Sequence, residues 1–212
     1  MLKSTRDAYG EALLRLGERE PQVVVLDADL SSSTRSSRFA ARFPERYFEM
    51  GIAEQNMYGV AAGLASCGKI PFASTFAVFA TERAFNQIRQ SIAYPNLNVK
   101  IVSSHGGLTA SGDGGSHQTL IDVGLMRCLP NMTVIVPADA VQAEQAVLAA
   151  AEHQGPVYLR LGKSEVPVLA EGKKLEDAVQ VANAAGALAV TKAGAQPSMP
   201  TRAELAAFLG KA

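Results

Sequence analysis

One glycine-rich segment carries most of the side chains that could take part in proton transfer. SSHGGLTASGDGGSHQ, residues 103–118, contains His105, Asp113, His117 and five glycines. Imidazoles donate to sugar hydroxyls or phosphates and exchange protons near neutral pH, and glycines let the backbone approach a ligand closely. We interpret the segment as a ligand-binding loop. Two alternatives are a flexible surface loop with a helix cap at Ser116, and a metal site. The metal site is disfavoured because the three residues lack compact ligand spacing.

A single acid opens an otherwise small and apolar helical segment. In GIAEQNMYGVAAGLAS, residues 51–66, Glu54 precedes a core-facing stripe that repeats at helical spacing. Its members are Met57, Val60, Ala61 and Leu64. Glu54 could simply favour the positive end of the helix dipole. It could also be a buried carboxyl with a chemical task, because desolvation raises the pKa of such a group.

Aromatic and cationic residues supply two further candidate sites. Phe76 and Phe79 in STFAVFATERAFNQIRQ, residues 74–90, are either core residues or a wall for a flat heterocycle. The charged residues of that segment are expected to form a solvated or interface face: Glu82, Arg83 and Arg89. Residues from three other segments, together with His105, could bind a phosphate: Arg6, Ser33 and Lys163.

Short β-branched runs alternate with helical patterns along most of the chain. Strands are expected at 23–30, 46–52, 70–75, 98–104, 133–139 and 156–161, and helices at about 3–18, 53–66, 77–92, 118–127 and 139–152. This alternation predicts an α/β fold with a doubly wound, mostly parallel sheet and helices on both faces. Sites in such sheets lie beyond the carboxyl ends of the strands, where the candidate polar residues fall.

Composition limits the classes of partner and marks a change near residue 170. The 212 residues carry 20 basic and 20 acidic side chains, which favours neither nucleic acid nor a membrane surface. Cys67 and Cys128 are expected to be buried free thiols, as in the reducing cytoplasm. From 170 the chain becomes alanine-rich, and we expect a helix at about 174–190 and then a short helix with a capping-box pattern at Thr201 and Glu204.

Three motifs in order resemble one protein family. GIAEQNMYGVAAGLA, STFAVFATERAFNQIR and SHGGLTASGDGGSHQTLIDVGLMRCLPNMTVIVPAD are similar to the pyrimidine-binding (Pyr) domain of transketolase. The closest similarity is to the C-terminal subunit of two-chain, split transketolases, over about residues 3–169. GDG at 112–114 lies inside a loop and not at a strand end, so we do not interpret it as the Mg²⁺-diphosphate motif of thiamine enzymes.

The resemblance implies a role for each matching residue. Glu54 matches the glutamate that hydrogen-bonds N1′ of the aminopyrimidine of thiamine diphosphate, and so helps to remove the proton from the thiazolium C2. Phe76 and Phe79 match the pyrimidine pocket, whose third aromatic position is Glu82 here. Asp29 matches an acid near the cofactor and the subunit interface.

The same resemblance implies a channel for sugar phosphates. His105 is directed toward substrate, Asp113 toward a sugar hydroxyl, and His117 toward the carbonyl or the adjacent hydroxyl. The phosphate-binding end of the channel is matched by Arg6, Ser33 and Lys163. Lys163 replaces the usual arginine, which keeps the charge but loses the bidentate geometry.

The implied activity needs a second chain. We expect transfer of a two-carbon ketol unit from a ketose phosphate to an aldose phosphate, as in the pentose phosphate pathway. A separate diphosphate-binding (PP) subunit would hold the phosphates and Mg²⁺ or Ca²⁺, in an α2β2 assembly. The 170–212 tail resembles the C-terminal end of ribokinase-like (PfkB) sugar kinases without their catalytic GAGD segment, so we expect it to be a helical cap or interface beside a 1–169 Pyr domain.

Three alternatives stay open at this point. A 1-deoxyxylulose-5-phosphate synthase-like chain shares GIAEQ and DGxxHQ, but usually lacks a histidine at position 105. A 2-oxo acid dehydrogenase β-like subunit shares GIAEQ without the histidine loop. The third alternative is a non-catalytic dimerisation or binding module.

Overall fold

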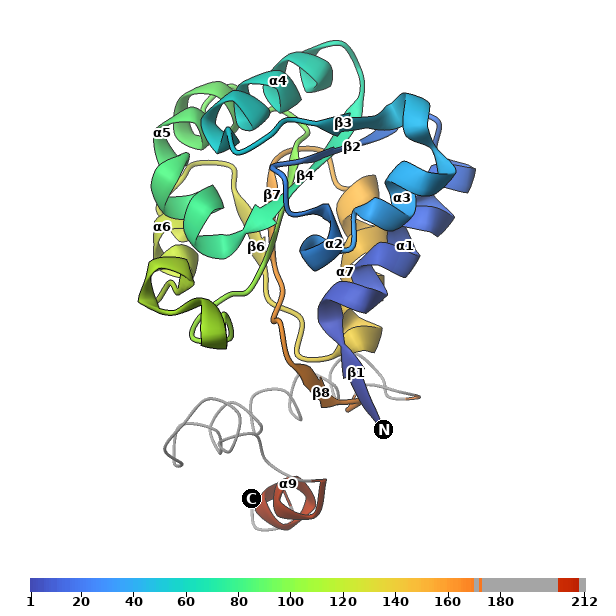
Figure 1. Ribbon diagram of the computed structural model, residues 1–212, viewed down its shortest axis with the longest axis vertical. Coiled ribbons are helices and arrows are strands. Elements are labelled where there is room, and N and C mark those ends of the chain that lie inside the picture. Colours follow the sequence, from blue (N-terminus) through green and yellow to red (C-terminus); the bar gives the residue numbers. More distant parts are fainter. Residues whose placement is uncertain (170–171, 173–201, 210–212) are drawn as a thin grey trace.

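The computed structural model describes residues 1–169, 172 and 202–209, and its centre is a parallel sheet (Figure 1). Six strands follow the order β3-β2-β4-β5-β7-β6, and every neighbouring pair is parallel. They are β2 (Val23–Asp27), β3 (Tyr47–Glu49), β4 (Ile70–Phe76), β5 (Lys100–Ser104), β6 (Thr133–Ile135) and β7 (Val157–Arg160). A separate antiparallel pair joins β1 (Leu2–Ser4) to β8 (Glu165–Pro167). The predicted α/β class is confirmed.

Helices cover both faces of the sheet, as expected for a doubly wound fold (Figure 1). One face carries α1 (Thr5–Arg19), α3 (Ser37–Arg42) and α7 (Ala140–Glu152). The other carries α4 (Glu54–Ser66), α5 (Phe85–Gln87) with the π-helical segments η2 (Phe79–Arg83) and η3 (Ile88–Ala93), and α6 (Asp122–Arg127). Short helices are α2 (Ser31–Thr34), η1 (Pro44–Arg46), η4 (Ser111–Asp113) and η5 (Gly115–His117), and α9 spans Arg202–Leu209.

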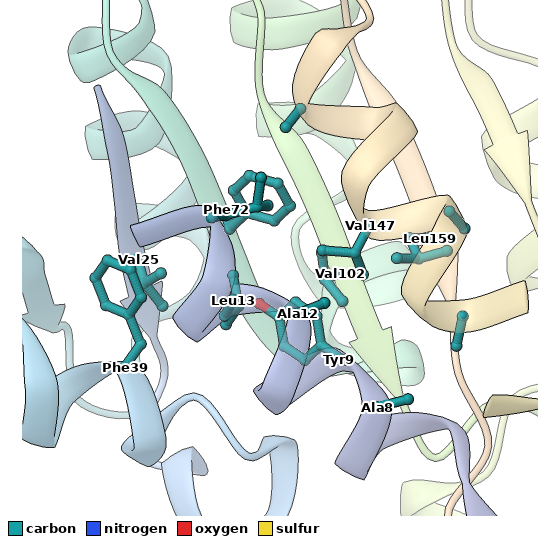
Figure 2. Close-up of a cluster of buried hydrophobic side chains, with 14 of the residues drawn as sticks. Ala8, Tyr9, Ala12, Leu13, Val25, Phe39, Phe72, Val102, Val147 and Leu159 are labelled. Carbon is teal, nitrogen blue, oxygen red and sulfur yellow. The ribbon is translucent and has the colours of Figure 1, made fainter. Parts of the chain in front are cut away.

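Two apolar clusters fasten these helices to the sheet. Figure 2 shows the first, where Leu13 of α1 and Val147 of α7 lie against Val25, Phe72 and Val102 of the strands. The second cluster packs α4 and its neighbours on the other face through residues such as Leu26, Met57, Tyr58, Ile88 and Ile101. Because β2 is buried along its whole length, its first four residues, VVVL, form a continuous apolar run and not an alternating one.

Several elements differ from the predicted boundaries. The first helix begins at Thr5, not at residue 3, because Leu2–Ser4 pair with β8 and the Ser4 hydroxyl caps the helix by accepting from the Asp7 N–H. The helix expected at 77–92 is divided into η2, α5 and η3. The one expected at 118–127 begins at Asp122, and the strand expected at 133–139 ends at Ile135.

The cysteine prediction is wrong in one respect. Cys67 and Cys128 are free, but both are exposed. Each is the residue that ends a helix, Cys67 after α4 and Cys128 after α6, and these helix ends lie at the surface of the chain.

The tail can be compared with the prediction only in part. The short helix expected after residue 200 is present as α9, whose first turn contains Glu204. Thr201 and the helix expected at 174–190 lie outside the described residues. Over the described ranges, no helix combines the length and the apolar character needed to cross a membrane.

Two helix glycines provide a test of the packing. A Cβ on Gly17 of α1 would lie 2.4 Å from Phe43 Cε2, whereas one on Gly59 of α4 would meet no atom within 4 Å. Alanine in a helix is favoured over glycine by about 1 kcal/mol, but overpacking costs about 1–3 kcal/mol. We expect Gly17→Ala to lower the free energy of unfolding in urea and Gly59→Ala to raise it. An equal response of the two variants would contradict the packing of α1 against α3.

Candidate active site

The polar residues expected from the sequence gather at the carboxyl edge of the parallel sheet. Phe76 is the last residue of β4, His105 directly follows β5, and Lys163 comes three residues after β7. Glu54 is the first residue of α4, which follows β3. Parallel strands end at the same edge, so residues far apart in the sequence meet there.

Glu54 is a buried carboxylate with a cationic partner. Only 2% of the residue is exposed, and its two carboxylate oxygens accept hydrogen bonds from Arg83 Nη1 at 3.2 and 3.4 Å. The Arg83 side chain is 50% exposed, and its guanidinium carbon lies 4.7 Å from the centroid of the Phe79 ring. Arg83 is exposed, as expected for a solvated or interface face, and it also reaches back to a buried acid.

Four rings form one aromatic cluster beside this ion pair. Phe76 and Phe79 are stacked with centroids 6.0 Å apart and planes 12° apart. His105 stacks on Phe76 at 3.7 Å, while His117 meets Phe79 edge-on at 5.2 Å. Contacts thus run without a break from Glu54 to both histidines of the glycine-rich loop.

His105 is held as a neutral imidazole. Its Nδ1 shares a 2.8 Å hydrogen bond with the Ser104 hydroxyl, and the residue is buried with a backbone φ of 60°. Burial, together with the nearby cations Arg6 and Lys163 and against the opposing charge of Asp113, lowers the pKa of His105 to about 4. The ring is therefore uncharged at neutral pH and has a second nitrogen, Nε2, for a ligand.

Two of the predicted phosphate-binding residues, Arg6 and Lys163, lie near His105, and each already donates a hydrogen bond within the chain. Lys163 Nζ donates to Asp113 Oδ2 at 3.2 Å and to the Ala110 carbonyl at 3.1 Å. The bond from Lys163 holds the pKa of the Asp113 carboxyl below its usual value. Arg6 Nη1 donates to the Ser33 carbonyl at 2.9 Å. The structure therefore brings Arg6 and Ser33 into direct contact, although 27 residues separate them.

Asp29 is placed differently from the other predicted residues. It is exposed, adopts a left-handed φ of 61°, and donates its backbone N–H to Glu49 Oε1 at 2.8 Å. This contact joins the end of β2 to the end of β3 and does not involve the aromatic cluster.

Asp27, two residues earlier, orders the loop that carries Ser33. Its carboxylate accepts from the Thr34 hydroxyl at 2.7 Å, the Ser36 hydroxyl at 2.8 Å and the Leu30 N–H at 2.7 Å. Burial raises the pKa of Asp27 to about 6, although these three bonds act in the opposite direction. This structural task could not be read from the sequence, because the hydroxyl donors of Asp27 come from the segment after β2.

A third buried carboxylate, Asp122, fixes Arg160 against the glycine-rich loop and was not singled out in the sequence. Asp122 accepts from Arg160 Nε at 2.6 Å and from the Tyr158 hydroxyl at 2.9 Å. Arg160 is packed so closely against Gly106 that a Cβ there would lie 2.6 Å from its Nε. Glycine is thus required at position 106 by close approach. The sequence did show an arginine, Arg160, inside the apolar strand PVYLRL, which indicates a buried acidic partner. Sequence spacing could not identify that partner as Asp122.

No group of three or more His, Cys, Asp and Glu side chains is arranged to hold a metal ion within residues 1–169, 172 and 202–209. Loop turns at η4 and η5 instead separate Asp113 from His117, and the bridge between Gly107 and Thr119 closes the loop at its base. The glycine-rich loop is therefore an ordered loop in contact with the sheet edge.

The sequence model of the family described as "Transketolase, pyrimidine binding domain" matches residues 2–168. The chain belongs to the transketolase pyrimidine-binding domain family. The edge that carries Glu54, the aromatic cluster and the glycine-rich loop is therefore the edge of a Pyr domain. A second model, "pfkB family carbohydrate kinase", matches residues 166–202, most of which lie outside the described residues.

Curated and solved relatives agree with this family. A "Putative transketolase C-terminal section" of Methanocaldococcus jannaschii is 49% identical over 81% of this chain and 54% of its own length. A "6-deoxy-6-sulfo-D-fructose transketolase subunit SqwH" of Clostridium sp. (strain MSTE9) is 46% identical over 74% of this chain and 48% of its own length.

Among solved structures, one described as "Split gene transketolase, inactive beta4 tetramer" superposes with a TM-score of 0.71 and 61% identity, covering 78% of this chain and 53% of that one. The chain thus spans about half the length of these relatives.

Titration of His105 tests the electrostatics of this Pyr-domain site. We expect the imidazole to stay neutral down to about pH 4, and Lys163→Met to raise its pKa by removing a cation. The unfolded chain binds this proton near pH 6.5, so His105 makes the free energy of unfolding fall as the pH falls from about 6.5 to about 4. The pKa of His105 is measured by NMR titration of the histidine-labelled chain, in which the His105→Asn variant assigns the signal. Protonation near pH 6.5 would contradict the placement.

Proposed function

We propose that this chain is the Pyr-domain subunit of a transketolase, which acts with a separate PP-domain chain to transfer a two-carbon ketol unit between sugar phosphates. The observation that carries the proposal is the continuous set of contacts from buried Glu54 through Phe79 and Phe76 to His105 and His117. A carboxylate, a flat apolar surface and two imidazoles thus lie side by side, which supports the proposal.

The residues fit an aminopyrimidine. Glu54 offers two carboxylate oxygens in a setting only 2% exposed, and both already accept from a planar cation that lies over the Phe79 ring. A planar nitrogen heterocycle needs the same two features, an acid at its edge and an aromatic surface at its face. Phe76 extends that surface toward the glycine-rich loop. Thiamine diphosphate, when bound, supplies the carbon nucleophile for the ketose carbonyl.

Each side chain of this chain then has its own task. Glu54 would share a proton with the pyrimidine N1′, and its burial would strengthen that interaction because water would not compete. The two phenylalanines exclude water from the ring. His105, neutral at working pH, hydrogen-bonds substrate through Nε2, and His117 contacts the sugar carbonyl or the adjacent hydroxyl.

The remaining residues would guide the sugar phosphate. Asp113 would bind a sugar hydroxyl. Arg6, Ser33 and Lys163 would bind the phosphate, for which Lys163 must exchange its present bond to Asp113. Asp29, exposed at the end of β2, would face the cofactor and the subunit boundary.

The partners are also part of the proposal. The PP subunit would hold the cofactor's phosphates and Mg²⁺ or Ca²⁺, and two copies of each chain would form an α2β2 heterotetramer in the cytoplasm, within the pentose phosphate pathway. Support comes from the relative named a transketolase C-terminal section and from the solved split gene transketolase. That solved protein is described as an inactive β4 tetramer, as expected of a chain that needs a partner.

We propose a division of the chain at the end of the Pyr domain. Residues 1–169 would form the thiamine diphosphate-binding domain, and 170–212 a helical tail that serves as a cap or interface. Support comes from the family match over residues 2–168 and the second match over 166–202.

Reconstitution tests the proposed function. The chain mixed with a PP-domain subunit, thiamine diphosphate and Mg²⁺ should catalyse ketol transfer, measured as aldose-dependent product formation. We expect Glu54→Ala to lower turnover about 100-fold or more, in the range typical of a lost acid–base group.

Glu152→Gln, an exposed acid at the far end of α7, serves as the matched control and should leave turnover unchanged. Full activity of Glu54→Ala at limiting cofactor would show that the role given to Glu54 is wrong. A wild-type homo-oligomer without any cofactor-dependent turnover would favour a binding module.

A further inference from the structure

Arg83 engages two of the groups that the proposed cofactor would need. Its Nη1 donates to both oxygens of Glu54, and its guanidinium lies over the ring of Phe79. A guanidinium is flat, donates in its own plane and stacks on aromatic rings through its face. An aminopyrimidine presents the same combination of an edge for a carboxylate and a face for a ring. Arg83 therefore pairs with the Glu54 carboxylate and covers the Phe79 ring without any ligand.

The local backbone explains why Arg83 reaches both groups. Arg83 ends the π-helical segment η2, in which the Ala84 N–H bonds to the Phe79 carbonyl five residues earlier at 3.2 Å. Phe79 and Arg83 are four residues apart, so they lie on the same side of this turn. Ala84 then leaves helical geometry, with φ −103° and ψ 14°, before α5 begins. Such π-helical turns often occur at functional sites.

The ion pair is suited to being exchanged. A carboxylate as buried as Glu54 needs a partner, because an unpaired buried charge is costly. Arg83 meets that need in the single chain, but half of its side chain remains in water. Solvent screening weakens the ion pair between Arg83 and Glu54, and the exposed half of the Arg83 side chain lets it turn toward solvent. The other buried carboxylates of this edge are bonded differently: Asp27 accepts from hydroxyls and Asp122 from a less exposed arginine.

We propose that Arg83 is an internal placeholder for the aminopyrimidine, which neutralises Glu54 and covers Phe79 in the unpartnered chain and has to withdraw when the cofactor binds. This inference rests on the proposed function and adds regulation to the same site. The unpartnered subunit is thereby kept stable and closed to the cofactor, and binding the cofactor includes the work of displacing Arg83.

The first experiment examines the full chain without a partner. The guanidinium of Arg83 is followed by ¹⁵N NMR in the wild type and in Glu54→Gln, with Arg83→Lys used to assign the signal. We expect slow hydrogen exchange at Arg83 in the wild type and faster exchange in Glu54→Gln. Equal and fast exchange in both would overturn the proposal, because the pair would then not exist in solution.

The second experiment measures affinity for thiamine diphosphate in the presence of Mg²⁺. It uses calorimetry on the free chain and half-saturation of the reconstituted complex. Arg83→Met should lower the dissociation constant or half-saturating concentration about two- to fivefold, the size expected for removing a partly exposed ion pair. Arg83→Lys should lie between Arg83→Met and the wild type. Arg89→Met is the matched control, because Arg89 is exposed and donates to Asn86, and it should change nothing.

The outcomes separate the two proposals. A wild-type complex that lacks cofactor-dependent turnover would overturn the proposed function. Calorimetry on the free chain would still test the placeholder role of Arg83, because it compares the cofactor affinities of the wild type and Arg83→Met. Active wild-type complex with an unchanged or higher half-saturating concentration in Arg83→Met would overturn the placeholder. A higher value would instead identify Arg83 as a permanent positioning residue for Glu54.

Discussion

A carboxylate buried to 2% exposure cannot remain without a partner, and the arrangement of the carboxyl edge follows from how Glu54 acquires one. The short β3 strand and the turn after it deliver Glu54 to the first position of α4, where it is covered by neighbouring elements. The π-helical turn after β4 then sends Arg83 back to it. Phe79 lies under that arginine, and Phe76 continues the aromatic surface to His105.

Several acids are buried at this edge of the sheet. Their hydrogen-bond partners distinguish the acids that stabilise the structure from Glu54, the acid proposed to take part in the reaction. In the described part of the chain they are Asp27, Glu54, Asp122 and Asp139. Asp27 orders the loop with Ser33, Asp122 fixes Arg160 beneath the glycine-rich loop, and Asp139 caps α7. The partner of Glu54, Arg83, is half exposed, whereas Arg160, the partner of Asp122, is 24% exposed. The partner of Glu54 can therefore be exchanged more easily than that of Asp122.

The fold was largely predictable because its signals are local. Continuous apolar runs such as VVVL and the core stripe of α4 report burial directly, and parallel strands place their following residues at one edge. Glu54, His105 and Lys163 could be named for that reason. Boundaries failed where a non-local contact decided them, as at Leu2–Ser4, which pair with β8.

The partnerships within the site could not be derived from spacing. Arg83 is exposed as predicted, but its contact with Glu54 could not be foreseen, because a regular helix from 77 to 92 was expected and a π-helical turn is present instead. Arg160 and Asp122 are 38 residues apart and meet because β7 lies between β5 and β6, the two strands that flank α6 in the sequence. The exposed cysteines were misjudged because an apolar neighbourhood in sequence does not show where a helix ends.

The central claim is that Glu54 holds the pyrimidine end of thiamine diphosphate. The most direct measurement is the ¹⁵N resonance of isotopically labelled N1′, recorded in the complex of this chain with a PP-domain subunit. A hydrogen bond from a carboxyl group to N1′ predicts a resonance displaced from that of the free cofactor, and a return toward the free position in Glu54→Gln. An N1′ resonance that is the same in both complexes would contradict the account.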